Sequence, residues 1–460
     1  MVKETKNIIG YLPDERPSWG KLILFAFQHI LVMFPATVLV ALLTGFHIST
    51  TIFASGLATL CFILVTKGKI PLYYGSSFSY IAAIIGITCI TTPGEIASDA
   101  LIGQAQFGII LSGFVSIGAG LIVNAFGFAK IQKVLPPAVT GPVAMIIGLS
   151  LAGTALSQAS GYNADLGTVS QSSWAIALIT LISIIVYTVI FKKGVLSQLP
   201  ILLGILTGYV AALLSDTFFR TNMLDFSNVF AEGFVNVPHF TLPVPSWTAV
   251  FAIMPIALAT IPESTAHLFQ IDLYVNDLAK KKATTKKYPI NDKLGLNLIG
   301  DGIGDIVSGF VGGPAGTNYG ENISTMAITK NFSIWVLGAA AIFTMIIAFF
   351  TPLANLIYTL PSAVIGGASI YLFGVIAAQG IAIMIEKKVD MFDAKNMAII
   401  AVILIFGVGG SFLFGGVIPM FGMQLPAIAT AAIAGILLNA GFLIGTAISK
   451  KTKKIEAIQE

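Results

Sequence analysis

Long apolar runs follow one another through almost the whole chain, and they limit its fold more than any other feature. Many are about 20 residues long, the length that a helix needs to cross a hydrocarbon core roughly 30 Å thick. Of the 460 residues, 56% are hydrophobic and only 10% are charged, whereas a soluble domain carries about 25% Asp, Glu, Lys and Arg. The sequence therefore predicts an all-α polytopic membrane protein.

Hydropathy along the chain predicts fourteen spans in two groups of seven. The first group covers residues 21–43, 51–66, 71–87, 106–129, 137–156, 173–191 and 196–215. The second group covers residues 247–270, 293–312, 314–330, 333–356, 361–384, 396–412 and 425–448. The third and tenth spans are short and are interrupted by Gly, Pro and Ser.

The positively charged residues support this count and give an orientation. With both termini in the cytoplasm, 24 of the 25 Lys and Arg residues fall on cytoplasmic segments, and only Arg220 does not. If the third or the tenth span did not cross the membrane, the segments between them would lie on the opposite side, and this positive-inside bias would be lost. We therefore predict cytoplasmic segments at 1–20 and 449–460, and an external loop at 216–246.

Composition argues against several other classes. The chain has four His and two Cys residues, and none has the spacing of a zinc finger or a zincin, so we predict no metal site and no cofactor. The net charge of +4 is explained by the cytoplasmic segments, so it does not indicate a nucleic-acid partner. Residues 1–20 are polar and lack the apolar region of a signal peptide, so no cleaved leader is expected.

Two sequence matches indicate an internal repeat. Pro-Ser-Trp opens the first span at 17–19 and the eighth at 245–247, an offset of 228. Leu-Pro-Pro-Ala-Val-Thr-Gly at 135–141 resembles Leu-Pro-Ser-Ala-Val-Ile-Gly at 360–366, an offset of 225. Because seven spans is an odd number, the second copy would insert upside down. Inverted repeats are typical of secondary transporters, whose paired interrupted helices mark the substrate site.

The interrupted pair consists of residues 71–79 and 312–322, in the third and tenth spans. Both begin with Gly, Pro and aromatic residues and then continue into helix-forming sequence. Extended backbone followed by a half-helix leaves free N–H groups and a positive dipole end available to a polar ligand. The alternative is that these residues only kink a helix for packing.

Four of the 21 acidic residues fall inside predicted spans: Glu263, Asp301, Asp305 and Glu321. A carboxylate at the bilayer centre costs a few kcal/mol or more, so each is a functional candidate. Because burial favours the neutral form of a carboxyl group, proton uptake there is chemically reasonable. A change of protonation coupled to substrate binding is what a proton symporter requires.

Spacing suggests how some of these groups are supported. Glu263 and His267 share one helix face at i, i+4, so the imidazole could hold the carboxyl group; the alternative is a polar pair that faces a loop. Glu321 falls where the second half-helix would begin. Gln28 and His29 could brace these groups by hydrogen bonds or serve packing alone.

Asp301 and Asp305 also stand at i, i+4. We expect Asp301 to support the site from behind, and Asp305 to face a polar interface. The Gly-Ile-Gly-Asp string at 302–305 matches the pattern of intramembrane aspartyl proteases. Such a protease needs a second Asp in another span, and no other predicted span has one, so the string does not indicate an enzyme.

Three segments resemble the nucleobase–ascorbate transporter family, and its uracil permeases in particular. They are Gln-His-Ile-Leu-Val-Met-Phe at 28–34, Gly-Ser-Ser-Phe at 75–78 and Tyr-Gly-Glu-Asn-Ile-Ser-Thr-Met-Ala-Ile-Thr-Lys at 319–330. The resemblance covers essentially the whole chain. It implies two inverted seven-span repeats, with short strands in spans 3 and 10.

The resemblance also implies a division into two domains and a dimer. The core domain would comprise residues 21–129 and 247–356, and the gate domain residues 130–215 and 357–448. A homodimer would form through the gate domain. The site residues carried over are Phe78, Glu263, Tyr319, Gly320 and Glu321 for the substrate, with His267 bonded to the Glu263 side. To these we add Gln28, His29, Asp301 and Asn322 as residues for proton coupling and support.

Together these features predict a proton-coupled importer of a nucleobase in the bacterial plasma membrane. Glu321 favours uracil, because purine-type members of the family usually carry Gln at that position. Two departures from the family pattern weaken the choice of base: Ser324 replaces a Gly, and Phe373 stands where uracil permeases have a Tyr. The alternatives are a xanthine or other purine permease and, less favoured, an anion transporter of sulfate-permease type.

Overall fold

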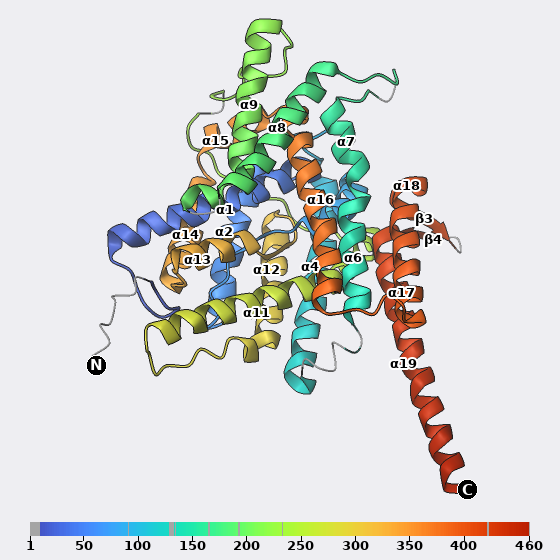
Figure 1. Ribbon diagram of the computed structural model, residues 1–460. Helices are drawn as coiled ribbons and strands as arrows, with labels where there is room; N and C mark the ends of the chain where they lie inside the picture. Colours follow the sequence, from blue (N-terminus) through green and yellow to red (C-terminus); the bar gives the residue numbers. More distant parts are fainter. Residues whose placement is uncertain are drawn as a thin grey trace. The chain divides into compact units, whose positions relative to one another are not determined.

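Helices make up most of the chain in the computed structural model (Figure 1), which describes residues 10–90, 92–127, 133, 135–163, 166–191, 194–231, 233–420 and 423–459. Among the described residues, eleven helices are long and apolar enough to cross a membrane. Two shorter apolar helices cover Phe78–Thr88 and Ile334–Ile347. The predicted class, a helical protein with many candidate spans, is confirmed; the count of fourteen stays a prediction.

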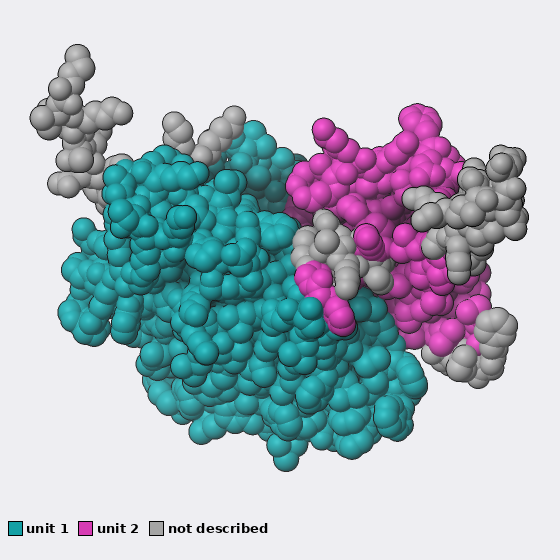
Figure 2. Space-filling view, turned by 90° about the horizontal axis from the view of Figure 1, so that it is seen from below, with its two compact units in different colours: residues 1–125, 153–371 teal, residues 126–152, 372–460 magenta. Residues whose placement is uncertain are grey.

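The chain divides into two compact units, which Figure 2 colours separately. Unit 1 comprises residues 1–125 and 153–371, and unit 2 comprises residues 126–152 and 372–460. The first half of unit 1 contains α1 (Trp19–Thr44), α2 (Ile48–Val65), β1 (Tyr74–Ser76), η1 (Phe78–Tyr80), α3 (Ile81–Thr88), α4 (Asp99–Phe126), α7 (Ala152–Ser160), α8 (Gln171–Ile190), η2 (Val195–Gln198) and α9 (Pro200–Phe219).

The remainder of unit 1 contains α10 (Trp247–Ile253), η3 (Met254–Ile256), α11 (Ala257–Lys281), η4 (Asn291–Lys293), α12 (Leu294–Val311), β2 (Gly316–Asn318), α13 (Gly320–Thr329), α14 (Ile334–Ile347) and α15 (Thr351–Tyr358). Helix α16 (Ser362–Glu386) continues from unit 1 into unit 2. Unit 2 also holds α6 (Pro137–Ser150), α17 (Ala394–Leu404), η5 (Ile405–Gly409), α18 (Gly410–Phe414), β3 (Val417–Met420), β4 (Met423–Pro426) and α19 (Ala427–Gln459).

A two-stranded antiparallel sheet lies inside unit 1 and joins the two interrupted segments. Tyr74 pairs with Asn318 and Ser76 with Gly316. The pairing continues past both strands, because Tyr319 N–H donates to the Tyr73 carbonyl (2.9 Å) and Ser77 N–H donates to the carbonyl of Ala315 (2.9 Å). Backbone groups that leave a helix at membrane depth need such partners, since no water is available there.

Helix α2 supplies further hydrogen bonds to the outer edge of β1. The hydroxyls of Ser55 and Thr59 both donate to the Tyr74 carbonyl, at 2.9 and 3.0 Å, and Thr59 also accepts from Tyr74 N–H. Each strand continues into a half-helix, α3 after β1 and α13 after β2. Both half-helices pack against α1.

Glycine allows α4 and α12 to approach each other at backbone distance. A Cβ atom at Gly302 would lie 2.3 Å from the Gly113 carbonyl oxygen, and one at Gly295 would lie 2.6 Å from that of Gly120. Small residues at such a crossing let membrane helices pack closely where lipid gives no hydrophobic driving force.

The polar segment after the eighth predicted span continues the helix and then contacts the N-terminal segment. Helix α11 continues to Lys281, well beyond the predicted span end at 270. Lys282 and Lys286 then form ion pairs with Glu15 (2.6 Å) and Asp14 (2.7 Å) of the N-terminal segment. The Lys-rich segment 272–292 therefore anchors the chain before α1.

Unit 2 differs from prediction at two places. A hairpin of β3 and β4 pairs Val417 with Pro426 and Met420 with Met423, whereas strands were predicted only in spans 3 and 10. Helix α19 continues to Gln459, so the predicted boundary between span and tail at 448 is not a helix end. A helix can continue past the apolar run that predicts it, and a short hairpin has no distinct hydropathy signal. Hydropathy therefore misses both features.

We expect Gly302→Ala to destabilise the protein, because its methyl group would collide with the α4 backbone. Overpacking of this kind typically costs about 1–3 kcal/mol, which a thermal melt of the detergent-solubilised protein would detect. Gly118→Ala is the matched control, since it lies on α4 and a Cβ there meets nothing within 4 Å. Equal melting temperatures for the two variants would contradict the packing argument.

Candidate functional site

The start of α13 is the feature around which the candidate site is built. Strand β2 ends at Asn318, and Tyr319 precedes the helix without a side-chain cap to its first turn. The first N–H groups of a helix have no partner within the helix. Glu321 lies in this first turn, and its carboxyl group interacts with its own backbone N–H, so a carboxyl group and the N–H donors of a helix start occur together.

Tyr319 is fixed from two sides. Its ring lies against Gly75 of β1, where a Cβ atom would come within 2.3 Å of the ring. Its hydroxyl is 2.9 Å from the hydroxyl of Thr37 on α1. Only glycine leaves room for the ring at position 75, so the strand sequence determines where the aromatic side chain lies.

Glu263 lies on α11, the helix that packs against α13. Its carboxyl group is close enough to those of Glu321 and Asp301 for their charges to interact. The structure thus brings three of the four acidic residues predicted inside spans into one neighbourhood. Asp305 has a different environment.

A buried hydrogen-bond network fixes Asp301. Its Oδ1 accepts from the Asn318 side chain (2.7 Å), and its Oδ2 accepts from the hydroxyl of Ser264. Asn297 donates to the same Ser264 hydroxyl (2.6 Å). The network links α11, α12 and β2 behind the start of α13, as expected for a supporting role of Asp301.

Asp305 faces a polar contact inside the protein, between α12 and the two strands. Its side chain is almost fully buried. Its Oδ1 accepts from the Tyr74 hydroxyl (2.5 Å) and from the backbone N–H of Gly316 (2.9 Å). The carboxyl group therefore ties α12 to both strands, because the extended backbone of β2 leaves an N–H that needs an acceptor.

His29 and Asn322 form the contact between α1 and α13. The Asn322 side-chain amide is 2.9 Å from the Nδ1 of His29 and donates to the His29 carbonyl (3.3 Å). Both residues are buried, and so is Gln28 beside them. His29 therefore contacts α13 through Asn322, and its bracing role stays a prediction.

His267 lies beside the backbone of the β2–α13 junction. A Cβ atom at Gly320 would lie 3.0 Å from its Nε2, and the imidazole is hydrogen-bonded to the backbone of Asn318. Its Nδ1 is buried without a hydrogen-bond partner. Within the described part of the chain no hydrogen bond joins His267 to Glu263, so the i, i+4 spacing was a poor guide to its partner.

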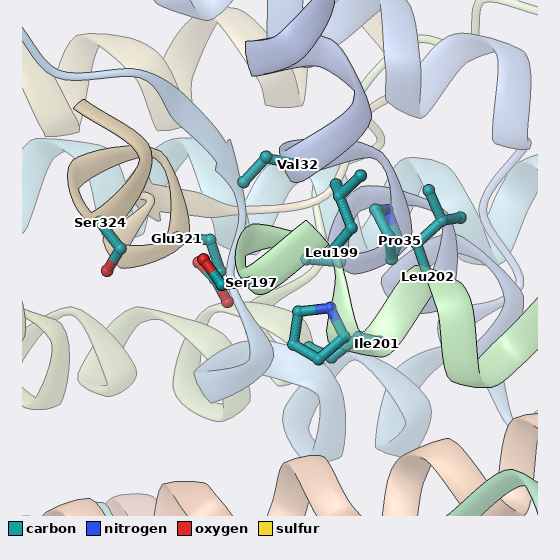
Figure 3. A pocket seen from close by; sticks show the side chains of 10 residues that line it. Val32, Pro35, Ser197, Leu199, Ile201, Leu202, Glu321 and Ser324 are labelled. Carbon is teal, nitrogen blue, oxygen red and sulfur yellow. The ribbon is translucent and has the colours of Figure 1, made fainter. Parts of the chain in front are cut away.

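A cavity of about 170 Å³ opens beside Glu321 (Figure 3). Its polar lining residues are Glu321 and Ser324 of α13 and Ser197 of η2. The apolar part of the lining comes from α1 and the start of α9: Val32, Pro35, Ala36, Leu199, Pro200, Ile201 and Leu202. Among the described residues, Phe78, Glu263, Tyr319 and Gly320 do not line it, although Tyr319 and Gly320 directly precede Glu321.

A second cavity, of about 180 Å³, lies between α1, α9 and α15. Its lining is apolar apart from Tyr209. It offers few hydrogen-bond partners to a polar ligand, so the cavity beside Glu321 is the better candidate site.

Sequence reasoning missed several residues that the structure places around this site. They include Thr37, Ser197, Ser264, Asn297 and Asn318. Asn297 stands one turn before Asp301, and Ser264 follows Glu263, so polar residues beside intramembrane acids were an available signal. Thr37 and Ser197 had none, because their role depends on contacts between distant segments.

Comparison with known proteins gives a consistent family. A family model described as "Permease family" matches residues 20–416. The chain is 37% identical over 433 residues to a uracil permease of Bacillus caldolyticus, covering 93% of each chain. It is 33% identical over 440 residues to a uracil permease of Escherichia coli K12, covering 95% of this chain and 94% of the relative.

Solved structures with low sequence identity share the fold. The inward-facing murine anion transporter Slc26a9 has a TM-score of 0.65 at 11% identity, covering 94% of this chain and 69% of that chain. The transmembrane domain of the cyanobacterial bicarbonate transporter BicA has a TM-score of 0.58 at 16% identity, covering 87% of this chain and 98% of that chain. At these identities the likeness concerns the fold alone.

We expect Asp301→Ala to destabilise the protein, because it leaves Ser264 and Asn318 with unpaired buried polar groups. Each such group costs about 1–3 kcal/mol, so the thermal midpoint should fall clearly. Asp292→Asn is the control, because it changes an exposed carboxyl group near the start of α12. It should change the melting temperature little. An unchanged melting temperature for Asp301→Ala would show that the network does not stabilise the fold.

Proposed function

The chain belongs to the nucleobase–ascorbate transporter family of permeases, and from this premise we propose that it imports a nucleobase, uracil by preference. The observation that carries the proposal is the placement of Glu321 in the first turn of α13, at the wall of a cavity with polar and apolar sides. Relatives at 33–37% identity that are named uracil permeases support the choice of base.

The chemistry of this cavity suits a pyrimidine base. Uracil presents two N–H donors and two carbonyl acceptors. The Glu321 carboxyl group can accept from an N–H, and the free N–H groups at the start of α13 can donate to a carbonyl. Phe78 and Tyr319 would flank the ring, and Glu263 would bind its other edge. None of the three lines the cavity, so this arrangement requires a movement that brings them to the base. Xanthine offers a similar donor and acceptor pattern and is the alternative substrate.

We place the substrate between a core and a gate domain, as in other inverted-repeat transporters. The proposal has fourteen spans in two inverted repeats of seven. The paired strands β1 and β2 support it, since they lie in the third and tenth spans. The cavity also supports it, because α1 and α13 belong to the proposed core, while η2 and α9 belong to the proposed gate. Movement of one against the other would expose the base alternately to each side.

Proton coupling is the proposed source of energy. The charged carboxyl groups of Glu321 and Asp301 would repel a charge on Glu263, so a proton on Glu263 removes this repulsion. Glu263 is the proposed protonation site, because it interacts with both of the others. One co-transported charge supplies about 2.3 kcal/mol at 100 mV. The cycle needs no bound cofactor and no catalytic step.

The location and assembly follow from the same proposal. The multi-span chain and its bacterial relatives indicate the plasma membrane. Both termini would lie in the cytoplasm, since that orientation puts nearly all Lys and Arg residues inside. A homodimer would form through the gate domain.

Glu321→Gln should weaken uracil binding, because the neutral amide replaces a charge-assisted hydrogen bond worth about 1.5–3 kcal/mol. Uptake of labelled uracil into cells that lack their own permease should show a half-saturating concentration about ten- to a hundredfold higher. Glu95→Gln, an exposed carboxyl group in the loop before α4, should behave as the parent. Unaltered uptake by Glu321→Gln would remove the carboxyl group from the site.

Glu263→Gln should abolish the acid stimulation of uptake, because an amide cannot bind the coupling proton. The parent should transport faster at pH 6 than at pH 8, and unlabelled uracil should compete better than xanthine. Competition by xanthine alone would assign the protein to the purine permeases. Acid-stimulated uptake that persists in Glu263→Gln would place the proton elsewhere.

A further inference from the structure

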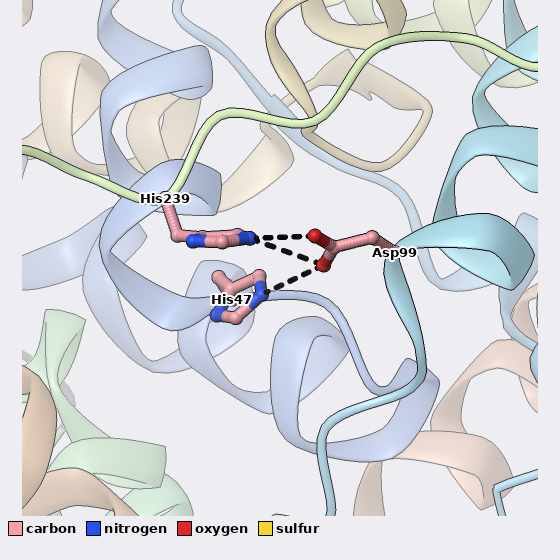
Figure 4. Close-up of side chains that lie close together, drawn as sticks. All are labelled: His47, Asp99 and His239. Carbon is pink, nitrogen blue, oxygen red and sulfur yellow. Dashed lines mark hydrogen bonds and ion pairs between the residues drawn. The ribbon is translucent and has the colours of Figure 1, made fainter.

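Three residues far apart in the sequence converge at one end of unit 1, away from the candidate substrate site. His47 lies between α1 and α2, Asp99 begins α4, and His239 lies in the extended segment before α10. Their side-chain ligand atoms all lie within 4.8 Å of one another. Figure 4 shows both imidazole rings directed toward the Asp99 carboxylate.

The distances leave room for an ion between the three groups. His239 Nε2 is 3.0 Å from one Asp99 oxygen and 3.1 Å from the other. His47 Nε2 is 4.0 Å from the nearer oxygen, too far for a hydrogen bond. Ligand atoms bound tetrahedrally to Zn²⁺ at 2.0–2.1 Å lie about 3.3 Å apart. Because the three ligand atoms lie within 4.8 Å of one another, their separations would have to change by at most about 1.5 Å.

His47 gives a second, independent indication of a ligand. Its Nε2 is buried and has no hydrogen-bond partner, although it faces Asp99. A simple His–Asp pair accounts for His239 and leaves this nitrogen unsatisfied. Buried polar atoms without a partner are costly, and a cation shared with Asp99 and His239 would provide the missing bond.

The backbone around the three residues is held by hydrogen bonds between their segments. Ala97 N–H donates to the Gly45 carbonyl (3.0 Å), which fixes the chain before Asp99 next to the end of α1. The Thr50 hydroxyl donates to the His239 carbonyl (2.7 Å). Further along, Val244 N–H donates to the Gly103 carbonyl of α4 (2.8 Å). The three positions are therefore fixed by the fold and not by their own side chains.

We propose that His47, Asp99 and His239 form a binding site for a divalent transition-metal ion, with Zn²⁺ as the best fit. Two imidazoles and one carboxylate are ligands that Zn²⁺ accepts, and a fourth position would be filled by water. The ion would fasten together the α1–α2 connection, the start of α4 and the segment before α10. Sequence patterns could not predict this site, because the three residues are far apart in the chain.

The test uses the full chain in detergent, purified with a tag that contains no histidine and freed of metal by dialysis against chelator. Isothermal titration with Zn²⁺ should show one ion bound per chain. His47→Ala, Asp99→Asn and His239→Ala should each weaken Zn²⁺ binding by at least about ten- to hundredfold. Loss of a residue that only supports a metal ligand already costs about that much. Asp225→Asn, an exposed carboxylate in the same connecting segment as His239, should bind as the parent does.

A second measurement needs no variant and covers the case in which a substitution prevents folding. X-ray absorption at the zinc edge of the loaded parent should show two imidazole ligands at about 2.0–2.1 Å and oxygen in the remaining positions. The absence of saturable binding by the parent, or one imidazole or none in the zinc shell, would overturn the proposal. Equal affinities of the parent and of the folded variants for Zn²⁺ would also overturn it. These readouts do not involve uracil, so they are independent of the proposed transport activity.

Discussion

Backbone hydrogen bonding between β1 and β2 is the constraint on which the rest of unit 1 depends. Two chain segments leave the helical conformation inside a helical membrane protein, and each can do so only because the other satisfies its N–H and C=O groups. Ser55 and Thr59 satisfy the outer edge from α2, and Asp305 accepts from Gly316 on the other side. The sheet then fixes where α3 and α13 begin, and therefore where Glu321 lies.

The polar groups around the sheet form two shells with different tasks. Asp305 accepts from Tyr74 and from the Gly316 N–H, and Ser264 joins Asn297 to Asp301, so these polar groups are satisfied within the protein. Within the described residues, Glu321 is hydrogen-bonded only to its own backbone N–H and Glu263 makes no side-chain hydrogen bond, so both carboxyl groups keep capacity for a ligand. This division between bonded and available carboxyl groups is the strongest physical reason to regard the second pair as functional.

The sequence was a good guide to class and a poorer guide to contacts. Hydropathy and charge bias predicted a many-span helical protein, and the Gly- and Pro-rich interruptions pointed to the segments that contain β1 and β2. Spacing along a helix failed for His267, because its partner is the backbone of Asn318 on β2 and not Glu263 one turn away. The network of Asp301 with Asn318, and the cluster of His47, Asp99 and His239, depend on tertiary packing that no local pattern encodes.

The central claim is that the base binds at the start of α13, where the sheet presents Glu321. A structure of the full chain in a lipid nanodisc, determined by electron cryomicroscopy with uracil bound, tests it most directly. The account predicts the base in contact with the Glu321 carboxyl group and the first-turn N–H groups of α13. Uracil bound in the apolar cavity between α1, α9 and α15, or at any position out of reach of Glu321, would contradict it.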